Sequence, residues 1–170
     1  MEKIKFGFVR HPYEPVFNKD SKVLILGTVP STASRQYGFY YTHPQNRFWR
    51  VLSSILNCEF PDTIEKKIEM LLKNRIAVWD VVKETEIKGS CDNTIKNPKP
   101  NDINLILNNA DIRAIFTTGK KAFELYNKLC YPKTKVEAYC LPSTSPANCV
   151  YTLDRLIDEY KVILKYIQKE

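Results

Sequence analysis

Glycine is scarce in this chain, with five glycines in 170 residues. They form neither the GxGxxG turn of a dinucleotide-binding fold nor the GxxxxGK(S/T) loop that cradles a triphosphate, since Gly119-Lys120 lacks the upstream glycine and is followed by Lys121. An enzyme that uses NAD or a nucleoside triphosphate is therefore disfavoured, and we expect no nucleotide cofactor.

Paired cysteines and long apolar runs are also missing. The cysteines are odd in number and include no CxxC pair, which disfavours a disulfide framework and a zinc or iron–sulfur site. The predicted free thiols are Cys58, Cys91, Cys130, Cys140 and Cys149. No run reaches the roughly 20 apolar residues of a membrane span, and Met1–Phe6 lacks the apolar core of a signal peptide. We expect a cytoplasmic protein with no metal and no membrane contact.

Positive charge is in excess. The chain has 26 Lys and Arg against 19 Asp and Glu, a formal net charge of +7. This surplus suits a polyanionic partner such as nucleic acid, although a merely basic surface would have the same composition. The length suits one domain spanning residues 1–170, which we expect to be monomeric.

Short apolar runs alternate with helical patterns along the chain. The runs have the continuous apolar character of parallel strands covered on both faces, and they span Lys22–Leu26, Ile76–Val81, Ala114–Thr117 and Val136–Leu141. Helical spacing of apolar residues covers Phe48–Leu56, Ile64–Leu72 after a Thr63 cap, a short stretch after Asp102, Gly119–Leu129, and Thr152 to the end. The alternation predicts an α/β fold, a three-layer α/β/α sandwich with a central four-stranded, mainly parallel sheet.

Two segments do not fit the alternation. Phe6–Phe17 contains two prolines and is expected to wrap the surface. Lys83–Pro100 is long, polar and rich in turn residues, so we expect an excursion over the strand ends that forms a wall over a pocket, rather than a linker between domains.

Polar turns follow all four predicted strands. They contain hydroxyl groups, lysines and exposed backbone amides, and they span Gly27–Thr32, Trp79–Asp80, Thr117–Lys121 and Leu141–Asn148. Because parallel strands bring their carboxyl ends to one edge, these turns are expected to converge there. Hydroxyls and amides beside helix N-termini suit phosphate contacts.

The segment Tyr40–Trp49, YYTHPQNRFW, lies just past the first strand. It combines aromatic faces, amide and imidazole groups and a guanidinium, which are the groups that bind a nucleobase. The same residues can instead cap and pack the following helix, and the segment alone leaves both interpretations open.

Six motifs resemble those of the uracil-DNA glycosylase superfamily, in order and spacing over nearly the whole chain. They are Gly27–Ser31 (GTVPS), Tyr41–Trp49 (YTHPQNRFW), Trp79–Val82 (WDVV), Gly89–Ile95 (GSCDNTI), Gly119–Ala122 (GKKA) and Leu141–Asn148 (LPSTSPAN). The chain most resembles the hypoxanthine-DNA (deoxyinosine) glycosylase branch, and the mismatch-specific uracil glycosylases are next.

The resemblance implies a monofunctional base-excision repair enzyme. Such an enzyme flips a deaminated base, here hypoxanthine, out of DNA and hydrolyses its N-glycosidic bond. A mismatch-specific uracil-DNA glycosylase, a non-catalytic nucleic-acid-binding module and a hydrolase of free nucleosides remain as alternatives.

The resemblance also suggests roles for single residues. Val29 stands where many relatives have a polar residue that positions the hydrolytic water. The resemblance to the hypoxanthine branch assigns that role to Asn46, whose amide can hold a water or hydrogen-bond the base, unless Asn46 only caps a helix. Tyr41 matches the aromatic that stacks on the flipped base, unless it is a core tyrosine. His43 and Phe39 are further candidates for binding the base, although the His43 ring could instead donate to the backbone.

The remaining candidates are expected to contact DNA. The motif 1 loop consists of Gly27, Thr28, Val29, Pro30 and Ser31. The second set consists of Ser143, Thr144, Ser145, Ala147, Asn148, Lys120 and Lys121, of which the Ser and Thr side chains can instead bond their own turns. Arg47 is expected either to bind a phosphate or to pair with Asp80.

Overall fold

The computed structural model describes residues 6–11 and 13–168, and its centre is a parallel four-stranded sheet. The strands lie in the order β3-β2-β6-β7, with β2 at Val23–Gly27, β3 at Ile76–Asp80, β6 at Ala114–Thr118 and β7 at Ala138–Leu141. Val23 pairs with Ile76 on one side and with Ala114 on the other. All four predicted strands are confirmed, with ends shifted by one or two residues.

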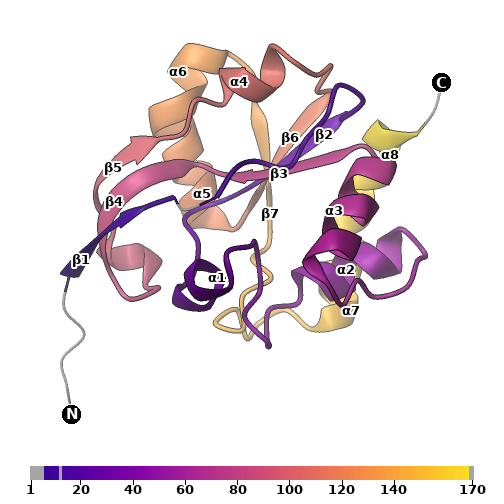
Figure 1. Ribbon diagram of the computed structural model, residues 1–170, viewed down its shortest axis with the longest axis horizontal. Coiled ribbons are helices and arrows are strands. Elements are labelled where there is room, and N and C mark those ends of the chain that lie inside the picture. The colour runs from indigo at the N-terminus through magenta and orange to yellow at the C-terminus, as the bar shows by residue number, and fades with distance from the viewer. Residues whose placement is uncertain (1–5, 12, 169–170) are drawn as a thin grey trace.

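Helices cover both faces of this sheet (Figure 1). One layer contains α2 (Phe48–Ile55), α3 (Ile64–Lys73), α7 (Leu153–Tyr160) and α8 (Leu164–Ile167), and the other contains α4 (Asn104–Leu107), α5 (Lys120–Leu125) and α6 (Tyr131–Thr134). Thr63 caps α3 as predicted, because its Oγ1 accepts the Lys66 N–H at 3.1 Å. The predicted helix over Gly119–Leu129 continues through a π-helical turn, and a 3-10 turn at Lys161–Ile163 interrupts the last helix.

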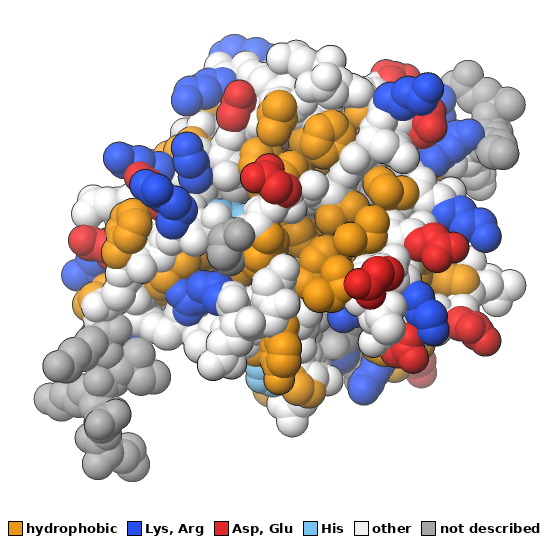
Figure 2. Space-filling view, in the orientation of Figure 1, with side chains coloured by type: hydrophobic (Ala, Val, Ile, Leu, Met, Phe, Trp, Pro, Cys, Tyr) orange, Lys and Arg blue, Asp and Glu red, His pale blue; other side chains and the backbone are white. Residues whose placement is uncertain are grey.

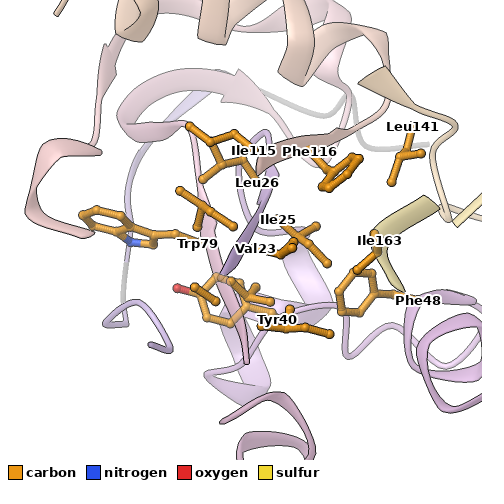
Figure 3. Packing of buried hydrophobic residues seen from close by; sticks show 14 of the residues in the cluster. Val23, Ile25, Leu26, Tyr40, Phe48, Trp79, Ile115, Phe116, Leu141 and Ile163 are labelled. Carbon is orange, nitrogen blue, oxygen red and sulfur yellow. The ribbon is translucent and has the colours of Figure 1, made fainter. Parts of the chain in front are cut away.

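The core lies between the sheet and the helices (Figure 3). Every residue of β2 and β6 is buried, which explains why both strands read as continuous apolar runs. Tyr40 and Phe48 also lie in this core, and the Trp49 indole N–H donates to the Tyr40 carbonyl at 3.1 Å. The core thus holds both ends of the Tyr40–Trp49 segment, so the residues between them are fixed in place.

A second, antiparallel sheet was not predicted. β1 (Phe6–Arg10), β4 (Val82–Lys88) and β5 (Lys96–Pro100) pair in the order β1-β4-β5, so much of Lys83–Pro100 and the start of Phe6–Phe17 are strands. β5 contains two prolines, which is compatible with its place at the sheet edge, where strand N–H groups need no partner. The 3-10 turn η1 (Asp92–Thr94) follows β4 and brings Asp92 towards the carboxyl ends of the parallel strands.

A short helix, α1 (Thr32–Tyr37), was not predicted. Of its residues only Ser34 is buried, so it has no apolar stripe to reveal it. Its signals are at the ends: the Ser31 hydroxyl accepts the Ser34 N–H at 3.1 Å, and Gly38 ends the helix at φ +71°.

Candidate active site

A pocket of about 620 Å³ lies at the carboxyl ends of the parallel strands. Its volume is in the range of small-molecule sites, and the predicted convergence of the turns is confirmed. Of the predicted site residues, Gly27, Thr28, Val29, Pro30, Ser31, Tyr41, His43, Asn46, Ser143, Thr144, Ser145 and Ala147 line it. Ser90 and Asp92 also line it, so the Lys83–Pro100 segment does form a wall of the pocket.

Four predicted residues lie outside this lining. Phe39 is a core residue, 5% exposed and stacked on Trp49, so the structure does not bring it to the pocket. Asn148 braces its own loop by donating from Nδ2 to the Ser143 carbonyl at 2.9 Å. Lys120 and Lys121 lie in the first turn of α5, with Lys120 exposed.

Asn46 is held by its side-chain oxygen. Oδ1 accepts the Phe48 N–H at 2.9 Å and the Thr144 hydroxyl at 2.9 Å. A backbone N–H can only donate, so the oxygen must face Phe48 and the amino group must point the other way. Asn46 therefore caps the N–H of Phe48, the first residue of α2, from one position before the N-cap Arg47. Its amino group remains as a hydrogen-bond donor for the pocket that it lines.

His43 is oriented in a similar way. Its Nδ1 lies 3.1 Å from the Gln45 backbone N–H and accepts its hydrogen bond. In a neutral ring the proton then lies on Nε2, so the ring has a donor left for a ligand. At this contact the backbone donates and His43 accepts, which is the reverse of the alternative in which His43 donates to the backbone.

Tyr41 is fixed from two sides. Its ring stacks on Phe48 with centroids 3.9 Å apart, and its hydroxyl lies 3.1 Å from Thr118 Oγ1. Burial and the nearby Asp80 charge raise the pKa of Tyr41, so the phenol stays neutral. Since one ring face is occupied by Phe48, a base can stack only on the opposite face.

Arg47 does not pair with Asp80, which corrects that expectation, and its guanidinium faces backbone carbonyls. Its guanidinium donates to the carbonyls of Ser145 at 3.0 Å and Asn148 at 2.9 Å, and also to the carbonyl of Tyr151. The arginine thus holds the loop that carries Ser143–Ala147 against the start of α2.

Asp80, which lines the pocket, instead pairs with His11. Asp80 Oδ2 lies 2.8 Å from His11 Nε2, and both side chains are over 90% buried. A Cβ on Gly27 would collide with Asp80 Oδ1, which explains why glycine ends β2. The distant His11 gave no sequence signal for this pair.

Asp92 is a pocket residue to which sequence reasoning gave no role. Its Oδ2 accepts a hydrogen bond from Thr28 Oγ1 at 3.4 Å. Burial, helped by the Asp80 charge, raises the pKa of Asp92 to about 6, although the Thr28 hydrogen bond and Lys121 act in the opposite direction. Its place in the GSCDNTI motif was the one available signal.

The raised pKa of Asp92 predicts that Asp92→Asn stabilises the protein at pH 7.5. A carboxyl group whose pKa is higher in the folded chain reduces stability as the pH rises from its usual value of 3.8 to about 6. Because the side chain is partly exposed, we expect a gain of about 1.5 kcal/mol, or about 3–6 °C in Tm. Thermal unfolding at pH 7.5 and pH 4 measures it, and the gain should vanish at pH 4.

The matched control is Asp20→Asn, at an exposed position before β2 and therefore at the opposite edge of the sheet. It should leave Tm unchanged at both pH values. An Asp92→Asn protein with an unchanged or lower Tm at pH 7.5 would show that burial does not penalise this carboxylate.

Two further classes of feature are absent from the part of the chain that the structure describes. Within residues 6–11 and 13–168, no helix is long and apolar enough to cross a membrane, and no three His, Cys, Asp or Glu side chains gather as metal ligands. The five cysteines are free, as predicted.

Comparison with known proteins agrees with the geometry. Residues 14–168 match the family model of the uracil DNA glycosylase superfamily. A hypoxanthine DNA glycosylase of Methanosarcina acetivorans is 34% identical over 86% of this chain and 93% of its own length, and one of Methanosarcina barkeri is 32% identical over 66% and 72%. A solution NMR structure from M. acetivorans, described as a uracil DNA glycosylase, superposes with a TM-score of 0.80 at 30% identity, covering 96% of this chain and 100% of that one.

Proposed function

The chain belongs to the uracil DNA glycosylase superfamily and is a DNA glycosylase, and from this premise we propose that the base it removes is hypoxanthine. The enzyme flips deoxyinosine out of DNA, hydrolyses its N-glycosidic bond and leaves an abasic site for base excision repair. The orientation of Asn46 carries the proposal, because an occupied oxygen leaves only the amino group to meet the base.

Hypoxanthine differs from adenine at the edge of the purine that carries position 6, where a hydrogen-bond donor of the pocket would contact it. Deamination replaces the amino group of adenine by the O6 acceptor, next to the N7 acceptor that both bases have. We assign the Asn46 amino group and the His43 Nε2 hydrogen to this edge. Adenine would bring its own amino group against them, and each buried donor left unpaired costs about 1–3 kcal/mol.

Guanine has the same O6 and N7 acceptors, so these donors cannot reject it. Selection against guanine comes instead from the free-energy cost of flipping a base out of the duplex. It amounts to a few kcal/mol and is least for a base that is already mispaired. Hypoxanthine opposite thymine is mispaired, whereas guanine opposite cytosine is not.

The other pocket residues serve the flipped nucleotide and its strand. The open face of Tyr41 stacks on the base, a contact of about 1–3 kcal/mol. Ser143 and Ser145 accept backbone N–H bonds through their hydroxyl oxygens, at 3.1 and 3.2 Å, so their hydroxyl hydrogens remain to donate to sugar or phosphate. Lys120 and Lys121 track the backbone, and we assign the protein to the cytoplasm as a single-domain monomer without a metal or a nucleotide cofactor.

A panel of oligonucleotides tests the base. Hypoxanthine, uracil and xanthine are each placed in single strands and duplexes, and the abasic product is cleaved by alkali and quantified. We expect release of hypoxanthine, fastest from a duplex opposite thymine. Release of uracil from G:U duplex with deoxyinosine left intact would assign the protein to mismatch-specific uracil removal. DNA binding without release of any base would show a non-catalytic module.

A further inference from the structure

The pocket needs a group that accepts a hydrogen bond from the attacking water. Hydrolysis of the glycosidic bond places a water at C1′ of the sugar, and a neighbouring acceptor orients that water and takes its proton. Val29 has no polar side-chain atom. The Asn46 oxygen is engaged by the Phe48 N–H and the Thr144 hydroxyl, so Asn46 can only donate to the pocket. The acceptor therefore comes from elsewhere.

The carboxylates that line the pocket are Asp80 and Asp92. Asp80 has one oxygen paired with His11 and the other close behind Gly27, under the backbone at the end of β2. Asp92 lies on η1 and also lines the pocket. Its Oδ2 accepts from Thr28, and within residues 6–11 and 13–168 no hydrogen bond to its Oδ1 occurs. Asp92 thus has an acceptor to offer.

On the basis of the proposed function, we propose that Asp92 is the catalytic base, which holds the hydrolytic water through Oδ1 and takes its proton. The water oxygen forms the new bond to C1′ as the bond from C1′ to N9 of hypoxanthine breaks. The bonding pair leaves with the base, and the water proton passes to Asp92. The donors Asn46 and His43 stabilise the departing anion, which then takes a proton from solvent.

The surroundings of Asp92 suit this role. Asp80 at the end of β3 and Lys121 on α5 are the charged groups that act on it, and Thr28 is its hydrogen-bond donor. A carboxyl with a pKa of about 6 is ionised at neutral pH, and it is a stronger base than an ordinary aspartate. The arrangement also explains why a chain of this family tolerates Val29 in the first motif.

The test measures single-turnover release of hypoxanthine against pH, from pH 5 to 9, with a deoxyinosine duplex. The wild-type rate should rise with pH through about 6, as Asp92 ionises. Asp92→Asn keeps the acceptor for Thr28, yet should lower the rate at pH 7.5 about a hundredfold and remove the rise near pH 6. Affinity for the lesion duplex should stay within about twofold, and Asp20→Asn should behave as wild type.

Thr28→Val provides a second variant. The Thr28 hydrogen bond lowers the pKa of Asp92. Its loss should therefore move the acid limb of the rate–pH profile, the rise in release rate near pH 6, to higher pH. A merely structural contact would lower the rate without moving the limb.

The failures are distinguishable. A wild-type protein that releases no base overturns the proposed function, and this inference with it. A wild-type protein that releases hypoxanthine while Asp92→Asn keeps the rate and the acid limb overturns the role of Asp92 alone. Loss of lesion binding in parallel with the rate also overturns it, because Asp92 would then recognise the base.

Discussion

Asn46→Asp is expected to lower the single-turnover rate of hypoxanthine release at least about tenfold, or about 1.4 kcal/mol of barrier. The aspartate still accepts from Phe48 and Thr144, so the cap on α2 remains. The amino group that faces the base is replaced by an oxygen, which repels the O6 and N7 acceptors. Asn46→Ala should lose as much activity, because it removes the same donor.

The pair of variants separates catalysis from capping. Asn46→Ala also loses the cap, so its unfolding free energy should fall by about 1 kcal/mol, whereas Asn46→Asp should keep it. Binding to undamaged DNA should change little in either. An Asn46→Asp protein with wild-type release would show that the amino group does not touch the base.

Arg47→Met is expected to lower Tm by about 6–12 °C. The change removes the donors to the carbonyls of Ser145, Asn148 and Tyr151. Hydrogen bonds to charged groups contribute about 1.5–3 kcal/mol each, and partial rescue by water leaves a loss of about 3 kcal/mol. At about 2–4 °C per kcal/mol for a chain of this size, that loss gives the expected shift. Thermal unfolding measures it.

Arg47→Met should also lower the rate of hypoxanthine release by about tenfold, measured at a temperature where the variant is folded. The loop that Arg47 holds carries Thr144, which bonds Asn46, so the pocket loses its shape. Arg50→Met, at an exposed position on the same helix, is the control and should change neither quantity. A shift in Tm as large in Arg50→Met would show that the effect comes from α2 itself.

The parallel sheet could be predicted from the sequence because its strands are buried on both faces. Burial on both faces makes β2 and β6 continuous apolar runs, and the carboxyl ends of parallel strands must meet at one edge. The pocket position followed from this rule. The antiparallel sheet could not be predicted, because β4 and β5 are polar and β1 pairs with a strand more than 70 residues away. Figure 2 shows the charged and hydrophobic side chains that mix on this part of the surface.

The motifs predicted which residues line the pocket more reliably than they predicted each contact. Tyr41, His43 and Asn46 line the pocket, whereas Phe39, which lies just before that motif, packs in the core. The partners of Arg47 are backbone carbonyls, which no sequence motif records. A residue type limits what a side chain can bond, but only the fold decides which partner it meets.

The most direct test of the account is the mass spectrum of the small molecule released from a deoxyinosine–thymine duplex, with wild type and Asn46→Asp side by side. We predict free hypoxanthine and an intact strand with one abasic site for the wild type, and at least about tenfold less of both for the variant. If deoxyinosine remained in the strand after incubation with the wild type, or if the two proteins released hypoxanthine equally, the account would be contradicted.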